Sequence, residues 1–462
     1  MQGEGMILRS CILDKALLPD GWADNVRIDI ADDGTIARVQ PGTEPDGAER
    51  IRGIALPGLP NLHCHAFQKG MAGLAERRGP ANDSFWTWRE VMYRFLGALT
   101  PDDVEAIAAY AYMEMLEAGY TSVGEFHYLH HDIGGTPYAD LGEMAARIAA
   151  ASTETGIGLT LLSSLYTYGG FGDAPPAPGQ VRFINSTDRF MTLMARSREI
   201  ISGVADAALG IAPHSLRAVS GAQLKAVGEV FAAGPIHIHA AEQTREVDEC
   251  VAVLGARPVQ WLLDHAGVDE RWCLIHATHM TEDETKRLAS AGAVAGLCPL
   301  TEGSLGDGIF NGEMFLHARG RFGIGTDSNI QIDAPAELRQ LEYSQRLKHR
   351  GRNVMTTVEG QSTGRSLYDA ALTGGTQALG RKIGALAPGH RADIVVLDAD
   401  HPDLAGVRGD DMILDIYVFS AGRALIDKTI VGGIDVVKEG RHRSRDGIAR
   451  RYRQVVSRLS NA

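Results

Sequence analysis

Eight short apolar runs alternate with longer stretches of helical periodicity in the central part of this 462-residue chain. Strands that alternate with helices are typical of parallel sheets built from βα units, and eight such units are the number that closes a (β/α)8 barrel. We therefore predict an α/β fold with a TIM-like (β/α)8 barrel over residues 57–384. The predicted strands end near His63, Glu125, Tyr166, Pro213, His239, His276, Pro299 and Asp327.

Capping and turn signals support the helices between these strands. Thr100 is a candidate N-cap followed by a proline and two aspartates, and apolar residues then recur at helical spacing up to Gly119. Thr281, followed by three acidic residues, repeats this pattern in a helix that is expected to end at Gly292. Three prolines within residues 169–179 predict a stiff loop.

The two ends of the chain show a different pattern, in which short strands are separated by turn signals such as Asp20-Gly21. The strands predicted there cover residues 7–13, 26–30, 35–39, 392–398 and 428–438. Because the late β-branched runs match the early ones in composition, we expect the ends to pair. The predicted unit is a small β-sandwich domain built from both chain termini, residues 1–56 and 385–462.

Charge and composition exclude several kinds of partner. The chain has 45 Lys and Arg against 58 Asp and Glu, a net charge of −13, which repels nucleic-acid phosphates and anionic lipids. No apolar run approaches the ~18 residues that cross a bilayer, and the amino end shows no secretory signal. Five scattered cysteines, with no Cys-x-x-Cys pair, fit a reducing compartment. We expect a cytoplasmic protein with no nucleic-acid or membrane partner.

Imidazoles and a carboxylate stand at the strand ends, the edge at which a parallel barrel builds its active site. His63 and His65 alternate on one strand, so both side chains point to the same face and can share a metal ion. His239 and Asp327 end two later strands. Three imidazoles and one carboxylate suit a catalytic zinc with one position left for water, although nickel, iron and manganese also fit these ligand types.

Two further residues are candidates for proton transfer and charge stabilisation. Glu242 follows His239 by three residues and is expected to act as a proton shuttle. His276 directly ends an apolar strand, which favours it over His279 for contact with the reacting centre. Each residue alone could be a hydrogen-bonded structural group, but four such strand ends in this order are hard to explain that way.

This arrangement resembles the deaminase and chlorohydrolase branch of the amidohydrolase superfamily. The motifs that carry the resemblance are Pro57-Gly58, His63-x-His65, His239-x-x-Glu242, His276, Asp327 and the tail at residues 383–395. The resemblance implies one Zn2+ per subunit, held by the His-x-His pair, His239 and Asp327, and a homodimer. The fourth strand candidate, residues 209–214, lacks the lysine of the dinuclear hydrolases, so one metal ion is expected.

Four further segments, at residues 68, 85–93, 124–131 and 212–217, resemble the N-formimidoyl-L-glutamate deiminase family of histidine degradation. This resemblance implies five substrate-binding residues, which are Gln68, Arg89, Tyr128, His214 and Arg217. A glutamate derivative carries two carboxylates, and guanidinium groups are well matched to carboxylates. Arg89 is placed in a long loop after the first barrel strand, where it could act as a lid or reach a neighbouring subunit.

The expected reaction is hydrolysis of N-formimidoyl-L-glutamate to N-formyl-L-glutamate and ammonia. Asp327 would accept a proton from water, Glu242 would move a proton to the amidine nitrogen, and His276 would stabilise the tetrahedral adduct. Alternatives that stay open are deamination of guanine or another purine-type ring, triazine dechlorination, and a non-catalytic scaffold. The aromatic residues 85, 86 and 88 fit packing better than ligand contact, and histidines 127, 130 and 131 fit hydrogen bonding better than a second metal site.

Overall fold

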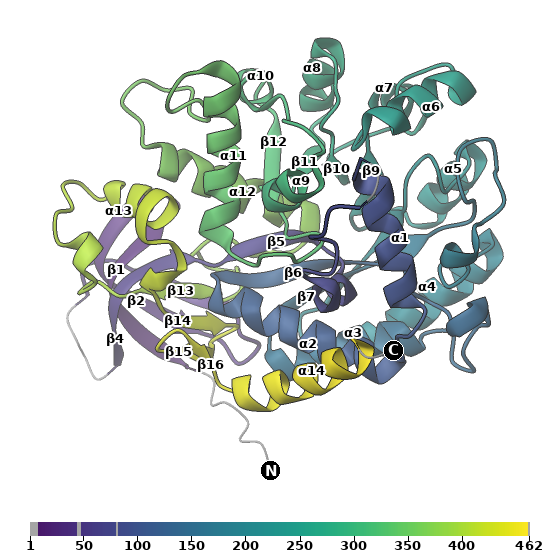
Figure 1. Cartoon of the computed structure of the whole chain (residues 1–462). Coiled ribbons are helices and arrows are strands. Elements are labelled where there is room, and N and C mark those ends of the chain that lie inside the picture. The colour runs from purple at the N-terminus through teal and green to yellow at the C-terminus, as the bar shows by residue number, and fades with distance from the viewer. Residues whose placement is uncertain (1–7, 44–47, 80–81, 461–462) are drawn as a thin grey trace.

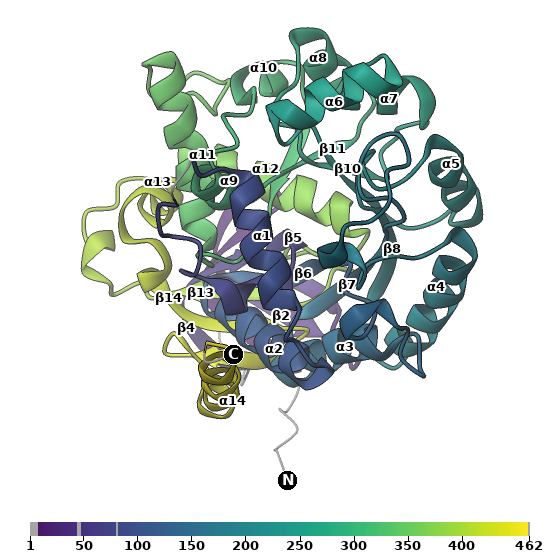
Figure 2. The ribbon, with the colours of Figure 1, turned by 45° about the vertical axis from the view of Figure 1, so that its right-hand side comes forward.

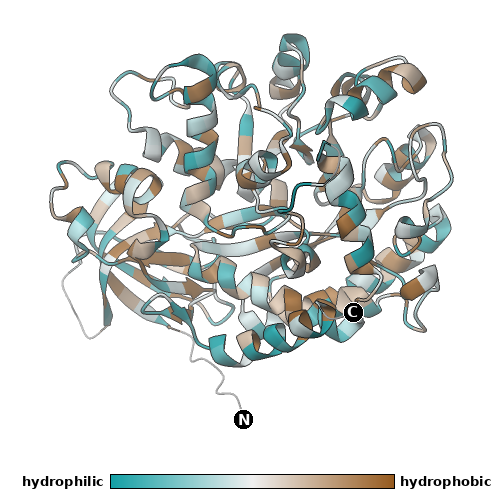
Figure 3. Ribbon diagram, viewed as in Figure 1, coloured by the Kyte–Doolittle hydropathy of each residue, from teal (hydrophilic) through white to brown (hydrophobic). Residues whose placement is uncertain are grey.

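The computed structural model describes residues 8–43, 48–79 and 82–460. Two eight-stranded sheets organise the molecule, one made by the central part of the chain and one by its two ends (Figure 1). The strands of the terminal sheet are largely hydrophobic in Figure 3, as expected for a sheet with a packed face. No helix in the described ranges is long and apolar enough to cross a membrane.

The central sheet contains eight parallel strands that pair in the order of the sequence. They are β5 (Leu59–Cys64), β6 (Tyr120–His127), β7 (Gly158–Leu165), β8 (Ala208–Pro213), β9 (Ile236–Ala240), β10 (Trp272–His276), β11 (Val294–Leu297) and β12 (Arg321–Ile324). Each ends at or close to the residue predicted from the sequence. The predicted (β/α)8 barrel is therefore confirmed.

Backbone hydrogen bonds close the barrel between its first and last strands. The carbonyl oxygen of His63 accepts from the N–H groups of Thr326 (3.1 Å) and Asp327 (3.0 Å), and the N–H of His65 donates to the carbonyl oxygen of Asp327 (3.0 Å). This closure brings Asp327 beside the two histidines, although more than 260 residues separate them along the chain. The barrel topology thus brings together candidate ligands that are far apart in the sequence.

Most of the helices surround the barrel (Figure 2). Those between β6 and β13 are α3 (Glu143–Thr155), α4 (Thr187–Ile201), α5 (Gly221–Val230), α6 (Thr244–Leu254), α7 (Pro258–His265), α8 (Glu282–Ser290), α9 (Pro299–Leu305), α10 (Gly312–His317), α11 (Ala334–His349) and α12 (Thr363–Leu379). Before β6 lies α2 (Pro101–Glu117). Thr100 caps α2 and Thr281 caps α8 through side-chain oxygens that accept backbone N–H groups, which confirms both predicted N-caps.

One glycine is required where α12 approaches the barrel. A Cβ atom on Gly374 would lie 1.9 Å from the carbonyl oxygen of Phe322 in β12, which is inside any allowed contact. Only a residue without a side chain permits this close packing of helix on strand.

A helix absent from the sequence prediction crosses the mouth of the barrel. Residues 85–96 form α1 (Phe85–Leu96), which follows a hydrogen bond from the N–H of Ser84 to Thr87 Oγ1 (3.0 Å). The prediction that Arg89 lies in a long loop is therefore wrong, because Arg89 is part of this helix. Its buried residues, which include Met92 and Phe95, recur at helical spacing, so an apolar face covers the mouth.

The two chain ends build one mixed sheet in the order β16-β15-β14-β13-β4-β1-β2-β3. Its strands are β1 (Ser10–Leu18), β2 (Gly21–Ile30), β3 (Ile36–Gln40), β4 (Glu49–Pro57), β13 (Ile394–Leu397), β14 (Ile426–Val431), β15 (Ile434–Lys438) and β16 (Arg441–His442). Antiparallel pairing of β13 with β4 joins the termini, which confirms that both ends form one β unit.

The first predicted strand differs in its bounds from the structure. Residues 1–7 lie outside the described part, and β1 continues to Leu18 instead of stopping at residue 13. Because β2 already begins at Gly21, the turn at Asp20-Gly21 joins two long antiparallel strands as a tight hairpin.

The last helix, α14 (Arg445–Leu459), packs against α2 of the barrel, below it in Figure 1. The ring of Tyr452 stacks on Tyr110 of α2 with centroids 3.9 Å apart, and Arg445 forms an ion pair with Glu117. A short helix, α13 (Met412–Ile416), precedes the final strands. The division of the chain at residues 57 and 384 stays a prediction.

Candidate active site

Four buried side chains converge at the carboxyl ends of β5, β9 and β12. The nearest ligating atoms of His63, His65, His239 and Asp327 lie within 4.8 Å of one another. Oδ1 of Asp327 lies 3.3 Å from Nε2 of His63 and 3.4 Å from Nε2 of His65, and Nε2 of His65 lies 3.4 Å from Nε2 of His239. Four donors so close together, none more than 5% exposed, form a site for a single cation.

Hydrogen bonds on the far side of two rings fix their orientation. Nδ1 of His65 donates to the carbonyl oxygen of Phe126 (2.9 Å), and Nδ1 of His239 donates to that of His214 (3.0 Å). In both rings Nε2 is therefore the nitrogen that carries the free lone pair. Such backbone acceptors behind histidines are typical of metal ligands.

The charge states of these groups also suit a cation. Burial lowers the pKa of His63 to about 3 and lowers the pKa values of His65 and His239, so all three rings are neutral at pH 7. Burial alone would raise the pKa of Asp327, but the neighbouring imidazoles of His63, His65 and His276 hold that pKa well below its usual range. Neutral imidazoles and an ionised carboxylate are the forms that bind metal.

The ring nitrogens of His63 have no hydrogen-bond partner in the described residues, which is unusual for a fully buried imidazole. A bound divalent cation would satisfy its lone pair. The four donor groups, including the unpaired imidazole of His63, thus fit a bound metal ion. Three nitrogens and one oxygen are a ligand set that zinc accepts.

The turn after β12 holds Asp327 in place. Both Asp327 (φ 43°) and Asn329 (φ 56°) adopt left-handed backbone conformations, which cost energy for residues other than glycine. Nδ2 of Asn329 donates to the carbonyl oxygens of His65 and Asp327 (3.1 Å each), and Oγ1 of Thr326 donates to Oδ1 of Asn329 (2.7 Å). This network aims the carboxylate at the imidazoles.

A second cluster surrounds His276 at the end of β10. Its Nε2 lies 3.7 Å from Oε1 of Glu242 and 3.9 Å from Oδ2 of Asp327, and its Nδ1 donates to Oε1 of Glu302 on α9 (3.2 Å). Burial alone would lower the pKa of His276, but the charge of Glu242 and the bond to Glu302 raise it to about 10. Burial raises the pKa of Glu242 to about 7. This pair can therefore hold and exchange a proton near neutral pH.

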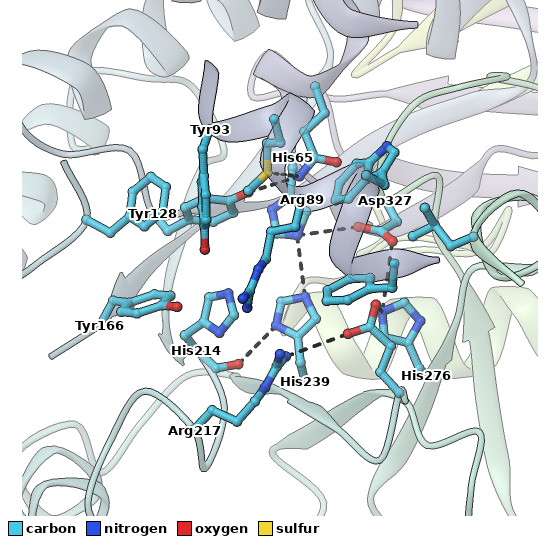
Figure 4. A pocket seen from close by; sticks show the side chains of 17 residues that line it. His65, Arg89, Tyr93, Tyr128, Tyr166, His214, Arg217, His239, His276 and Asp327 are labelled. Carbon is cyan, nitrogen blue, oxygen red and sulfur yellow. Dashed lines mark hydrogen bonds and ion pairs between the residues drawn. The ribbon is translucent and has the colours of Figure 1, made fainter. Parts of the chain in front are cut away.

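These groups open into a cavity between the barrel and α1 (Figure 4). All five predicted substrate-binding residues line it together with His65, His239, Glu242, His276 and Asp327. His63 lies behind this wall, and His279 instead hydrogen-bonds to the carbonyl oxygen of Asp307 (2.8 Å). The five predicted substrate-binding residues are Gln68, Arg89, Tyr128, His214 and Arg217.

Two arginines enter the cavity from different elements. Arg217 is 8% exposed, its Nη2 lies 3.7 Å from Oε2 of Glu242, and its Nε has no partner in the described ranges. Arg89 reaches in from α1, with its guanidinium 4.6 Å from the ring centre of Trp86, and its Nε is likewise unpaired among described residues. Buried guanidinium donors without acceptors are prepared to receive an anion.

The neighbouring aromatic and histidine segments are placed as follows. Phe85 and Trp88 form part of the cavity wall, so the expectation of pure packing does not describe these two rings. His130 donates to the carbonyl oxygen of Ser164 (2.9 Å) and His131 to that of Ile184 (2.9 Å). As predicted, His130 and His131 act as hydrogen-bonding residues, whereas Nε2 of His127 has no partner among the described residues. No cluster of possible metal ligands forms around these histidines in the described ranges.

Some residues of the site were not predicted from the sequence. Tyr93, Tyr166 and Phe183 line the cavity, and Glu302 supports His276. Tyr166 carried a usable signal, because it ends a predicted barrel strand as the proposed ligands do. The other three lie on helices or loops, where neither spacing nor strand position marks them.

Comparison with known proteins agrees with this geometry. The chain matches the Amidohydrolase family over residues 54–435 and the domain described as "Formimidoylglutamate deiminase HutF, N-terminal domain" over residues 13–53. It is 50% identical to the formimidoylglutamate deiminase of Pseudomonas aeruginosa over 450 residues, which is 96% of this chain and 98% of that one. The 8-oxoguanine deaminase of the same organism is 28% identical and covers 88% of each chain.

Solved structures give the same result. An amidohydrolase from Brucella melitensis superposes with a TM-score of 0.93 at 52% identity, over 98% of this chain and 99% of that one. A zinc-bound adenosine deaminase from Xanthomonas campestris, 19% identical and covering 98% of both chains, has a TM-score of 0.80, which supports the fold alone. With its closed barrel, its buried His-His-His-Asp site and these matches, the chain belongs to the amidohydrolase family, in the group that includes the formimidoylglutamate deiminase of Pseudomonas aeruginosa.

Proposed function

We propose that this protein hydrolyses N-formimidoyl-L-glutamate to N-formyl-L-glutamate and ammonia. The observation that carries the proposal is that two arginines, Arg217 buried and Arg89 partly buried, share one cavity with three of the four metal ligands and with the Glu242–His276 pair. A substrate with two carboxylates and one amidine needs this combination, since a chain with a net charge of −13 attracts an anionic substrate only through a local cationic site. The name of the 50% identical relative supports the same substrate.

The roles of the chain's own residues follow from their positions. A divalent metal ion, which we propose to be a single zinc held by the quartet, would supply Lewis-acid activation of water at this site. Asp327, which its low pKa keeps ionised and therefore free to accept, takes a proton from the attacking water. Glu242 holds a proton near neutral pH and delivers it to the amidine nitrogen, so that ammonia can leave. His276, protonated by its acidic neighbours, donates a hydrogen bond to the tetrahedral adduct.

Cavity residues outside this group bind and orient the substrate. Arg89 and Arg217 hold the carboxylates, while Gln68, Tyr128 and His214 line the path toward the reacting carbon. The side-chain amide of Gln68 donates to the hydroxyl of Tyr128 (2.9 Å), which fixes both groups before substrate arrives. Fixed donors of this kind lower the entropy lost on binding.

An ammonia-release assay tests the function directly. Purified protein loaded with zinc is expected to release ammonia from N-formimidoyl-L-glutamate and to show at least a hundredfold lower kcat/KM with guanine or 8-oxoguanine. A chain that deaminates only the purines would overturn the substrate assignment. A chain that binds metal and hydrolyses none of these compounds would favour the scaffold alternative.

Replacing Arg217 by glutamine tests the carboxylate site. We expect kcat/KM for the diacid to fall by about 100-fold or more, because a buried charge-assisted contact is worth a few kcal/mol. Metal content should stay normal, since Arg217 is no ligand, and Arg287→Gln on the exposed face of α8 should change kcat/KM by less than about threefold. Unchanged kinetics in the Arg217 variant would show that Arg217 does not bind the substrate.

The family resemblance and the composition support three further proposals. The protein is proposed to be a homodimer, to carry one zinc per subunit and to work in the cytoplasm. The last proposal agrees with its five cysteines, which are all free and buried.

A further inference from the structure

The proline-rich segment at residues 169–179 has no role in the proposed mechanism, yet it ends at a fully buried amide. Gln180 closes the short helix η3 (Pro178–Gln180) and is 1% exposed. Its Oε1 accepts from the N–H of Ala177 (2.7 Å), and its Nε2 donates to the carbonyl oxygen of Gly169 (3.3 Å) and to the hydroxyl of Tyr166 (2.8 Å). Because backbone groups occupy the oxygen and one N–H, the amide has one orientation, and the loop presents a donor to Tyr166.

This donor determines what the Tyr166 hydroxyl can do. Since the phenolic oxygen accepts from Gln180, its own proton is free to be donated elsewhere. No protein atom in the described ranges accepts that proton, although Tyr166 is only 7% exposed. The ring is fixed by contacts with His214 and Phe183, whose ring centres lie 4.5 Å and 5.6 Å away. A buried, oriented donor without an acceptor faces the cavity.

The arginines lie on the side of the cavity toward which this hydroxyl points (Figure 4). Burial raises the pKa of Tyr166, and the charges of Arg217 and Arg89 oppose that rise, which places both guanidiniums within electrostatic reach. The second Gln–Tyr pair of the cavity, Gln68–Tyr128, instead packs against the metal ligand His65, at a ring distance of 4.8 Å. The two tyrosines share contacts with Phe183 and His214, but a ring contact with the metal ligand His65 is made by Tyr128.

We propose that Tyr166 is a further substrate-binding residue, which donates a hydrogen bond from its hydroxyl to one of the substrate carboxylates that Arg89 and Arg217 hold, and that Gln180 is the residue that positions it. This inference rests on the proposed function and deepens it. A carboxylate oxygen has lone pairs left after it accepts from a guanidinium, and the tyrosine supplies an uncharged donor to one of them. Together the two guanidinium groups and the Tyr166 hydroxyl favour an anionic substrate bound in one position.

Steady-state kinetics of Tyr166→Phe test the proposal. With holoenzyme and N-formimidoyl-L-glutamate, KM is expected to rise about 10- to 100-fold, the range for a lost hydrogen bond to a charged group, while kcat changes less than about threefold. Metal content and Tm should stay unchanged. The matched control is Tyr120→Phe, because Tyr120 is also fully buried with an unpaired hydroxyl but does not line the cavity. It should leave both constants unchanged.

Two further measurements separate this role from a structural one. Gln180→Leu is expected to raise KM less than Tyr166→Phe does, and the double variant should be no worse than Tyr166→Phe alone, because Gln180 acts through Tyr166. Formimidoyl derivatives of glutamine and isoglutamine each lack one carboxylate. The increase in KM caused by Tyr166→Phe should persist with the analogue that keeps the carboxylate bound by Tyr166. With the other analogue, the increase in KM should fall below twofold.

The outcomes distinguish this inference from the proposed function. If the wild-type protein releases no ammonia from N-formimidoyl-L-glutamate, the function itself fails. If it does, then an unchanged KM in Tyr166→Phe, a loss confined to kcat, or an equal loss with both monoacid analogues would overturn the role of Tyr166. If a lowered Tm shows that Tyr166→Phe folds poorly, the KM of Gln180→Leu is used instead. An unchanged KM in that variant would then overturn the role of Tyr166.

Discussion

Glu242→Gln is expected to lower kcat for N-formimidoyl-L-glutamate by about 10³-fold or more while the protein keeps its metal. Glutamine matches the shape of glutamate but cannot carry a proton, and general acid–base catalysis by a placed side chain contributes roughly 10²–10⁴-fold. Because Glu242 lies 3.7 Å from both His276 and Arg217, the loss of its charge also weakens the stabilisation of the protonated imidazole. The measurement is kcat together with zinc content by atomic spectrometry.

Its control is Glu249→Gln, on helix α6, which begins two residues after Glu242; Glu249 is ion-paired with Arg245 away from the cavity. That variant should keep wild-type kcat. If Glu242→Gln retains more than about a tenth of the wild-type kcat, another group carries the proton and the assignment is wrong.

His239→Ala is expected to remove the metal and, with it, essentially all activity. The substitution leaves two imidazoles and one carboxylate, and the loss of one of the four candidate ligands would weaken the binding of a divalent cation strongly. We expect less than about a tenth of the wild-type zinc after dialysis. Zinc stoichiometry by atomic spectrometry, measured with Tm on the same sample, checks the result.

The matched control is His237→Gln, two residues earlier on β9. Nε2 of His237 donates to the carbonyl oxygen of Ala378 (2.7 Å), so it takes no part in the quartet. This variant should bind zinc at the wild-type ratio even if its Tm falls. Full zinc content in His239→Ala would mean that the ion sits elsewhere.

The barrel and its quartet were predictable because their signals are local. Buried parallel strands are short apolar runs, and the polar residues that end them lie at the functional edge of the sheet. The spacing of His63 and His65 gives a shared face directly, since side chains in a strand alternate. The chain order of strands then determines which ends become neighbours, so Asp327 could be joined to the histidines without coordinates.

The rest depends on tertiary contacts that no local pattern records. Helix α1 was read as a loop because its apolar face covers a cavity and carries the polar Arg89 on the same side. Glu302 and Gln180 act through His276 and Tyr166, and each partner pair is separated along the chain by a helix or a loop. The fold of the connection after β7 brings Gln180 to Tyr166, and the pairing of β10 with β11 brings Glu302 on α9 to His276.

Closure of the barrel by its first and last strands links the completion of the metal-ligand quartet to the completion of the barrel. His63 and His65 are synthesised early, whereas Asp327 emerges after about 260 further residues and docks through backbone bonds to His63 and His65. A nascent chain that has not yet released β12 from the ribosome holds three of the four ligands. A divalent cation would therefore find all four ligands only when the ring of barrel strands is complete.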